Sequence, residues 1–268
     1  MDKNNITIIL PTLNEKENLE SLIPSIVDML KNNHLNLKYE ILVVDDGSTD
    51  GTSDYVNSLI RKSNCISFIE RSKKKSLPLS IYEGIENSKY SNVMWLDADG
   101  SMNADAIKKL LDHYFSNTET SHAVVGSRFT EGGGYKGVKD TQNQSILKSI
   151  QNVKESNDSV LGMILSILIN KLLSFLFRSD LTDLTSGFVV LRKELIEKDV
   201  FLNKDYGEYF IYLLGSLIKK NIPIDEVGYI CETRMYGVSK TGSGIVTFTI
   251  RGIPYIIAAM KRGRVNWI

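Results

Sequence analysis

Short apolar runs alternate with segments of helical periodicity through the first half of the chain. The predicted strands cover residues 6–11, 39–45, 66–70, 92–97 and 123–129. The predicted helices cover residues 15–32, 52–62, 77–88 and 104–114. Strands separated by helices form βαβ units, so we expect an α/β fold with a mainly parallel sheet. Ligands then bind at the carboxyl ends of its strands.

The second half contains an apolar segment, residues 160–177, with a single charged residue, Lys171. Ser166, Asn170 and Ser174 recur at every fourth position and form a narrow polar stripe on a helix. This pattern favours an amphipathic helix that is buried or lies in a membrane interface. A transmembrane span is the alternative, because the segment approaches the length that a bilayer requires.

The C-terminal apolar stretch, residues 245–260, is interrupted by Arg251 and Pro254. It predicts one or two interfacial helices, with Tyr255 and Trp267 as anchors at the headgroup level, and two hairpinned spans are the alternative. Residues 233–268 contain six Lys or Arg residues and no Asp or Glu. Such a segment suits anionic lipid headgroups or phosphates, whereas the alternative is a solvated basic tail.

The chain has 268 residues, of which 42% are hydrophobic and 24% are charged. These values allow a full core without disulfides, and a formal net charge of zero argues against a general nucleic-acid binder. Cys65 and Cys231 lie in strand-like stretches and are interpreted as buried thiols in a reducing compartment. The first ten residues carry no signal-peptide pattern, and residues 130–158 are the best candidate for a mobile loop.

The strongest chemical signal is the pair Asp97 and Asp99 at the end of the predicted strand 92–97. In an extended segment residues i and i+2 face the same way, so both carboxylates project together at the carboxyl edge of the sheet. Two hard oxygen ligands at this place can hold Mg²⁺ or Mn²⁺ while a substrate diphosphate completes the shell. Capping of the following helix is the alternative role for these carboxylates.

Two further loops place acidic residues at strand ends. Residues 11–15 (PTLNE) close the first strand, and residues 43–52 (VVDDGSTDGT) close the second. Helix capping accounts for Ser48 and Asp50, but it does not account for two adjacent carboxylates at the strand end. Asp46 is therefore a candidate acceptor for the ribose hydroxyls or base edge of a nucleotide.

Together these motifs resemble those of family 2 glycosyltransferases, in the dolichol-phosphate mannose synthase-like (polyprenyl-phosphate glycosyltransferase) branch. The matching segments are PTLNEKENL at 11–19, VVDDGSTDGT at 43–52, DAD at 97–99, GSR at 126–128, DLTSGF at 183–188 and ETRMYGVSK at 232–240. They cover nearly the whole chain in the order of the family. The resemblance implies a GT-A fold, in which a Rossmann-like, mostly parallel mixed sheet flanked by helices is followed by C-terminal amphipathic interface helices.

The resemblance also implies a division of the chain. Residues 1–240 would form the catalytic domain, with a nucleotide-binding half at 1–115 and an acceptor half at 116–240 that includes the amphipathic helix 160–177. Residues 241–268 would form a basic, apolar segment that associates with the membrane.

The same resemblance implies roles for single residues. The donor-binding set would be Pro11, Leu13, Glu15, Val44, Asp46, Asp97, Ala98, Asp99, Arg128, Arg234 and Lys240. The metal ligands would be Asp97 and Asp99, and these two with Arg128 would form the catalytic group. The acceptor-binding set would be Arg128, Ser166, Ser186 and Arg234, with residues 185–187 beneath the acceptor, although a plain tight turn before a strand is the alternative for these three residues. Arginine suits these roles because its planar fork matches phosphate oxygens.

The chain departs from the family pattern at three places. Ser76-Leu77-Pro78 stands where the family shows Gly-Leu-Gly, which puts the sugar or base preference in doubt. Leu13 replaces a usual Tyr, and Gly162 replaces an Arg that precedes Ser166 by four residues. Lys154 or Lys171 is a candidate to bind the acceptor phosphate in place of that Arg.

The resulting expectation is an inverting, metal-dependent transferase that moves mannose or glucose from a donor of the GDP-mannose or UDP-glucose type to a polyprenyl or dolichyl phosphate. We expect it to associate peripherally with the cytoplasmic face of a membrane, and a helper membrane subunit is left open. One alternative is a family 2 transferase that acts on a glycan or protein acceptor. The other is a non-catalytic, nucleotide-sugar-binding subunit that recruits a partner to membranes.

Overall fold

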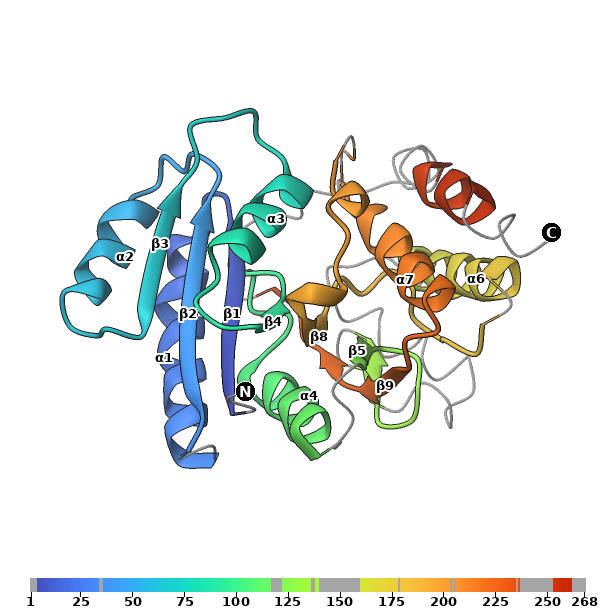
Figure 1. The fold of residues 1–268 in the computed structure, drawn as a ribbon, viewed down its shortest axis with the longest axis horizontal. Coiled ribbons are helices and arrows are strands. Elements are labelled where there is room, and N and C mark those ends of the chain that lie inside the picture. The colour runs from blue at the N-terminus through green and yellow to red at the C-terminus, as the bar shows by residue number, and fades with distance from the viewer. Residues whose placement is uncertain are drawn as a thin grey trace.

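The computed structural model describes residues 4–33, 36–116, 122–135, 138–139, 160–177, 179–202, 204, 206–234, 236 and 253–261. Its centre is a seven-stranded sheet with the order β3-β2-β1-β4-β8-β5-β9 (Figure 1). The strands are β1 (Asn5–Thr12), β2 (Lys38–Asp45), β3 (Ile66–Glu70), β4 (Asn92–Trp95), β5 (Ala123–Ser127), β8 (Val189–Arg192) and β9 (Ile224–Gly228). Within this sheet only β8 runs antiparallel to its neighbours, so the predicted mixed, mostly parallel sheet is confirmed.

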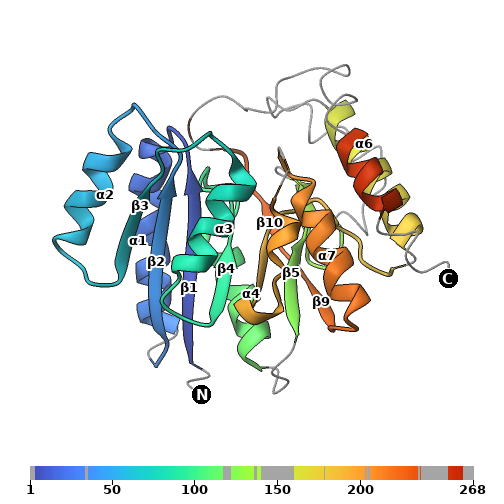
Figure 2. The ribbon, with the colours of Figure 1, turned by 45° about the horizontal axis from the view of Figure 1, so that its top comes forward.

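Helices cover both faces of the sheet (Figure 2). They are α1 (Lys16–Asn33), α2 (Thr52–Ile60), α3 (Leu77–Asn87), α4 (Ala104–Ser116), α6 (Val160–Phe177) and α7 (Tyr209–Lys219). Two 3₁₀ turns, Lys193–Leu195 and Lys198–Val200, follow β8. A small second sheet joins β10 (Ile230–Cys231), β6 (Gly134–Tyr135) and β7 (Val138–Lys139).

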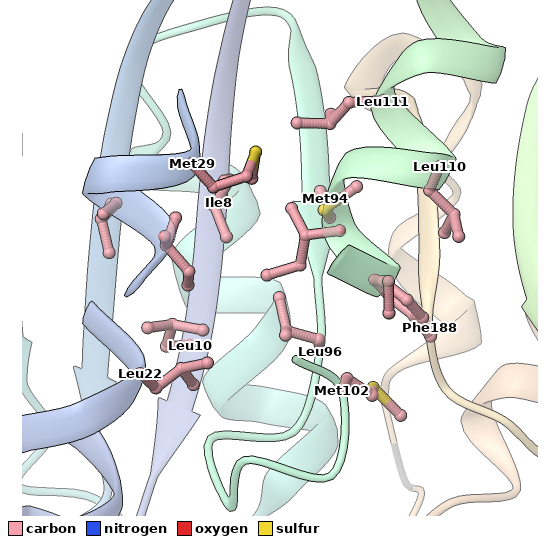
Figure 3. Packing of buried hydrophobic residues seen from close by; sticks show 14 of the residues in the cluster. Ile8, Leu10, Leu22, Met29, Met94, Leu96, Met102, Leu110, Leu111 and Phe188 are labelled. Atoms are coloured by element: carbon pink, nitrogen blue, oxygen red, sulfur yellow. The ribbon is translucent and has the colours of Figure 1, made fainter. Parts of the chain in front are cut away.

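Successive side chains of the strands point to opposite faces of the sheet and pack into two separate cores. Ile8 and Leu10 of β1 pack with residues of α1 and α4, such as Leu22 and Leu110, as Figure 3 shows. Ile9 points to the other face and belongs to the core beneath α3 and α7. Because both faces of the sheet are covered, its central strands are apolar throughout instead of alternating with polar residues.

The strand and helix predictions for residues 6–116 are confirmed, with differences at their ends. The strand predicted through Asp97 ends at Trp95, where its pairing with β1 and β8 also ends. The strand predicted through Phe129 ends at Ser127. Asp97 therefore stands in a loop beyond the sheet and not within a strand.

The apolar segment 160–177 is one helix, α6, and it lies with residues 253–261, also helical, at the end of the molecule opposite α2 (Figures 1 and 2). Within the described part of the chain, no helix has the length and apolar character needed to span a bilayer. The predicted helix 245–260 is observed from residue 253 onward. Its earlier part, Trp267, Lys154 and most of the loop predicted at 130–158 lie outside the described residues.

The two cysteines are free thiols, but only one is buried as expected. Cys231 lies in β10 with 6% of its surface exposed. Cys65 precedes β3 and is half-buried, with its Sγ 2.9 Å from Ser63 Oγ. The prediction of a buried thiol at Cys65 is therefore wrong, because the residue stands just outside the strand that would have covered it.

Candidate active site

The loops after β1 and β2 are hydrogen-bonded to each other. Asn14 N donates to Ser48 Oγ (2.7 Å), and Thr49 N donates back to Asn14 Oδ1 (2.8 Å). Lys16 N, at the start of α1, donates to Asp50 Oδ2 (3.0 Å). Asn14 has a φ of 53°, a left-handed conformation that asparagine tolerates better than most residues. Ser48 and Asp50 thus fix the two loops against one another at the carboxyl edge of the sheet.

Asp46 lies at the centre of a buried polar cluster that no sequence motif indicates. Its carboxylate accepts hydrogen bonds from Arg71 Nη1 and from Ser76 N. Arg71 is 4% exposed and also donates to Glu83 Oε2 (3.1 Å) and Ser80 Oγ (2.9 Å). A buried guanidinium with these partners holds the Asp46 carboxylate in one orientation.

Residues 76–78, which replace the Gly-Leu-Gly pattern of the family, form the start of α3. Ser76 is the N-cap of α3, and its hydroxyl accepts from Leu79 N (3.4 Å). Pro78 stands in the first turn, where its missing N–H has no cost. The backbone N–H of Ser76 takes no part in α3 and donates to Asp46. The helix start is therefore compatible with the loss of both glycines.

The loop after β4 brings Asp99 against Arg234. Arg234 Nη2 lies 2.9 Å from Asp99 Oδ2, and Ser101 N donates to Asp99 Oδ1 (2.9 Å). Ser101 O accepts from Glu232 N (2.9 Å), so the segment after β10 is held against this loop. Asp99 is 4% exposed. Two segments more than 130 residues apart thus meet at one carboxylate, as the resemblance implied.

Asp97 is an exposed residue in the loop after β4, and the protein around it partly desolvates its carboxyl group. The surrounding protein raises its pKa to about 7, and the neighbouring charge of Asp99 adds to the shift. Arg234 and Arg128 act in the opposite direction, while Glu15 raises the pKa further. Three acidic side chains and two arginines therefore lie within electrostatic reach of one another.

Glu15 is linked to the segment that follows Arg234. Asn18 Nδ2 donates to Glu15 Oε2 (2.6 Å) and to Tyr236 O (3.3 Å). Tyr236 N donates in return to Asn18 Oδ1 (3.2 Å). These contacts place the start of α1, and Glu15 with it, beside the loop that carries Arg234.

Arg128 is held by a buried carboxylate. Its Nε and Nη2 donate to Asp183 Oδ2 (2.7 Å) and Oδ1 (2.8 Å), and its backbone N also donates to Asp183 Oδ2 (3.0 Å). Asp183 is fully buried, whereas the side chain of Arg128 is 14% exposed. Nη2 also donates to Thr185 Oγ1 (2.9 Å). The Asp183 charge raises the pKa of Arg128, which therefore stays cationic.

The polar stripe of α6 faces the protein interior. Asn170 is 1% exposed, accepts from Leu184 N (2.8 Å) and donates to Thr185 Oγ1 (2.9 Å). Since Thr185 also accepts from Arg128, α6 is connected to Arg128 through one hydroxyl. Ser166 and Ser186 are both buried, and Ser186 Oγ accepts from Phe188 N (3.4 Å). Their predicted contact with an acceptor stays a prediction.

The remaining predicted donor-site residues are mostly covered. Val44 and Ala98 are buried in the two cores, Pro11 is buried in β1, and Leu13 is half-buried. Lys240 lies outside the described residues. The donor-binding role of this set stays a prediction.

Two tyrosines near Asp97 are not predicted by any sequence motif. Tyr209, at the start of α7, accepts from Trp95 Nε1 (3.0 Å). Burial raises the pKa of Tyr209 well above its usual value, and the charge of Asp97 contributes to the shift. Tyr255, from residues 253–261, is affected in the same way by burial and, to a smaller extent, by Asp97. The apolar setting of these aromatic residues in the sequence gives no signal of their proximity to the site.

The residues at this edge fit a divalent cation in part. Among the described residues, no group of three or more His, Cys, Asp or Glu side chains has the geometry of a complete metal site. Asp97 and Asp99 nevertheless offer hard oxygen ligands, and desolvation together with the Asp99 charge raises the pKa of Asp97. A cation bound there would need a diphosphate and water to complete its shell.

The model of Glycosyl transferase family 2 matches residues 7–200 of this chain. A dolichol-phosphate mannosyltransferase of Pyrococcus furiosus is 31% identical to this chain over 88% of the chain's residues. The chain spans only 58% of the length of that protein. A polyprenol monophosphomannose synthase of Mycolicibacterium smegmatis is 28% identical, over 89% of this chain and 82% of that protein.

The fold has counterparts among solved structures. A glucosyl-3-phosphoglycerate synthase of Mycobacterium tuberculosis, crystallised with Mn²⁺, UDP and glucosyl-3-phosphoglycerate, matches with a TM-score of 0.64 at 16% identity. The match covers 97% of this chain and 80% of the synthase. With this similarity and the mixed sheet, the predicted GT-A fold is confirmed. The chain belongs to glycosyltransferase family 2.

Proposed function

We propose that this protein transfers a hexose from a nucleotide-sugar to a polyprenyl or dolichyl phosphate at a membrane surface, with a divalent cation and with inversion at the anomeric carbon. The observation that carries the proposal is the meeting of Asp97 and Asp99 with Arg234 and Arg128 beside an apolar helix pair. Carboxylates suit a cation, and the arginines suit the phosphates of donor and acceptor.

Each charged side chain has a role in this proposal. Asp97 and Asp99 would hold Mg²⁺ or Mn²⁺, which when bound supplies charge neutralisation for the leaving nucleoside diphosphate. Arg234 reaches Asp99 and is placed to gather a phosphate next to it. Arg128 is fixed by Asp183 and presents its 14% exposed side chain to a second phosphate.

The acceptor would attack without a strong base. A lipid monophosphate has a second pKa of about 6 and is already anionic at neutral pH. The attacking oxygen therefore has no proton to lose, and the positioning of the two substrates supplies much of the catalysis. A single displacement of this kind inverts the anomeric carbon.

The surface beside the site suits a membrane. On α6, Leu168, Leu172 and Phe175 are exposed, Phe175 by 78%. Residues 253–261 expose Ile253, Ile257 and Met260 at the same spacing of four and three positions. Among the described residues, α6 and residues 253–261 thus each carry an exposed apolar stripe at the same end of the molecule (Figure 1), and we refer to the two stripes together as the apolar surface. Exposed lysines accompany them at 171 and 261.

The names of the relatives favour mannose and a polyprenyl phosphate. The test is to incubate the purified protein with Mn²⁺, polyprenyl phosphate and a panel of nucleotide sugars that includes GDP-mannose and UDP-glucose. We expect a glycolipid that partitions into the organic phase. Asp99→Asn should lower its formation by at least 100-fold, whereas Asp225→Asn, an exposed carboxylate bonded to His113, should match the parent.

Membrane association is tested separately with vesicles that contain anionic lipid. Phe175→Glu should weaken co-sedimentation, because it places a charge in the exposed apolar stripe of α6. Lys109→Gln changes the net charge equally on α4, away from that surface, and should bind as the parent does. Equal binding of Phe175→Glu and the parent would contradict the role of this surface.

The same transfer assay separates the competing functions. One arm of it offers phosphoglyceric acid, with which the Mycobacterium tuberculosis synthase was crystallised, and another offers an aqueous glycan. Label that enters either of these but never a lipid would replace the proposal with a different acceptor. Donor binding by calorimetry without turnover on any acceptor would support a non-catalytic subunit.

A further inference from the structure

Glu226 of β9 holds the backbone of the turn at residues 182–183. Its Oε2 accepts from Thr182 N (2.8 Å), and its Oε1 accepts from Asp183 N (2.9 Å). The hydroxyl of Thr182 also lies 3.0 Å from Oε2 and 3.2 Å from Oε1. A single carboxylate thus accepts from two consecutive backbone N–H groups, which fixes the turn against the edge strand of the sheet.

The turn determines where Asp183 lies, and Asp183 determines where Arg128 lies. Both oxygens of Asp183 are used by the guanidinium, and one also accepts from the backbone of Arg128. This bidentate arrangement requires that the Asp183 backbone be set in position and direction. Glu226 fixes this backbone through the N–H groups of residues 182 and 183, so Glu226 and Asp183 together connect β9 to Arg128.

The arrangement places two carboxylates, Glu226 and Asp183, close to each other. Burial raises the pKa of Glu226, and the charge of Asp183 adds to the shift. Two carboxylates so close to each other repel, so the position of Glu226 carries an electrostatic cost beside the hydrogen bonds that it accepts. Within the described chain, the hydrogen bonds of Glu226 go to Thr182 and Asp183 and to no substrate-facing group.

We infer that Glu226 is a positioning residue for the transfer reaction, which acts by fixing the 182–183 turn so that Asp183 presents Arg128 to a phosphate. The inference rests on the proposed function, because it requires that Arg128 contact a substrate. In this arrangement Glu226 contacts residues 182 and 183 of the turn and acts on the substrates only through Arg128.

The strand offers a matched control. Asp225 is the adjacent residue, points to the other face of β9, and bonds to His113 at the surface (3.0 Å). Glu226→Gln and Asp225→Asn each remove one carboxylate charge from the same strand. Only the first replaces an acceptor oxygen with an N–H₂ group that faces a backbone N–H.

Kinetics with Mn²⁺, donor and polyprenyl phosphate should show a loss of about 10- to 100-fold in kcat/KM for Glu226→Gln, with no change for Asp225→Asn. Because the effect acts through Arg128, it should shrink to less than about 2-fold when Arg128→Lys is already present. A Glu226→Gln variant with parental kcat/KM would overturn the inference. An undiminished loss in the Arg128→Lys background would do so as well, since it indicates general destabilisation.

A second readout does not depend on turnover. In ¹⁵N spectra of arginine side chains, the Arg128 Nε–H should give a slowly exchanging signal in the parent that Arg128→Lys removes. Its exchange should accelerate at least 10-fold in Glu226→Gln or, if that variant does not fold, in the shorter Glu226→Asp. Unchanged exchange refutes the positioning role, whereas full activity of Arg128→Lys refutes the proposed function of Arg128 instead.

Discussion

Replacing Gly207 with alanine tests how residues 253–261 are docked beside the active site. A Cβ built on Gly207 would lie 1.9 Å from the Tyr255 hydroxyl oxygen and 3.0 Å from its Cζ. Ordinary contact requires about 3.5 Å, so the tyrosine must retreat by roughly 1.5 Å. The Tyr255 ring is partly buried and packs against the core beneath α3 and α7, so its retreat disturbs that packing.

The magnitude follows from the cost of overpacking, which is about 1–3 kcal/mol at a well-packed position. We expect this energy to destabilise the packing of residues 253–261 against the rest of the protein. Because about 1.4 kcal/mol corresponds to a factor of 10, amide hydrogen exchange in this segment should accelerate by about 5- to 150-fold. Hydrogen exchange with mass spectrometry can follow peptides from this segment. The transfer activity should fall as well, because Tyr255 lies within electrostatic reach of Asp97.

The matched variant is Tyr255→Phe, which removes the atom that would lie at 1.9 Å and leaves the next at 3.0 Å. Combined with Gly207→Ala, it should recover at least half of the lost protection, whereas alone it should change protection little. Gly207→Ala with parental exchange would show that the segment is not seated on Gly207. A loss that Tyr255→Phe does not relieve would show that the clash with the hydroxyl is not responsible.

Three further predictions concern charged and polar side chains. Because the pKa of Asp97 is raised from 3.8 to about 7, the folded protein holds a proton that the unfolded chain releases, and its stability falls as pH rises through that interval. The Asp97→Asn variant does not titrate at this position, so the difference between its melting temperature and that of the parent should grow from about pH 4 and level off above pH 7. Both melting temperatures are measured in the presence of a chelator. Arg71→Met should lower the free energy of unfolding in urea by about 3–5 kcal/mol, because it leaves Asp46 buried with its charge uncompensated. Parental stability would show that the Asp46–Arg71 pair does not stabilise the fold. Asn170→Ala should cost about 1–3 kcal/mol in the same assay, because the buried N–H of Leu184 loses its acceptor.

The sequence predicts the first half of the fold well because its signals are local. Alternating apolar runs and capped helices repeat from residue 6 to residue 116, and each strand pairs with another that the same pattern marks. The strands β8 and β9 and the helix α7 are not predicted from pattern. The antiparallel β8 inserts between β4 and β5 through pairing of residues about 100 and 65 positions apart, which no local pattern encodes.

The candidate site shows the same division between local and long-range information. Motifs identify Asp97, Asp99, Arg128 and Arg234, and the structure brings them within electrostatic reach. The motifs do not identify their partners: Asp183 has no role apparent from its motif, and Arg71 is only a basic residue that precedes residues 76–78. Both act by contacts across 25 or more positions, so their roles become visible only when the sheet is assembled.

We expect the charge balance at the candidate site to set the order in which a cation and a nucleotide bind. Glu15, Asp97, Asp99 and Asp183 contribute four carboxyl groups to the candidate site, whereas Arg128 and Arg234 contribute two guanidinium groups. A nucleoside diphosphate that approaches this group without a cation meets an excess of like charge, and a divalent ion removes it. We therefore expect that chelation will abolish binding and not only turnover. Calorimetry with GDP or UDP should show at least a 100-fold weaker Kd in EDTA than in Mn²⁺. In Asp99→Asn this difference between the two Kd values should be smaller. Equal affinity with and without the metal would mean that the arginines alone hold the diphosphate, and the two carboxylates would then need another role.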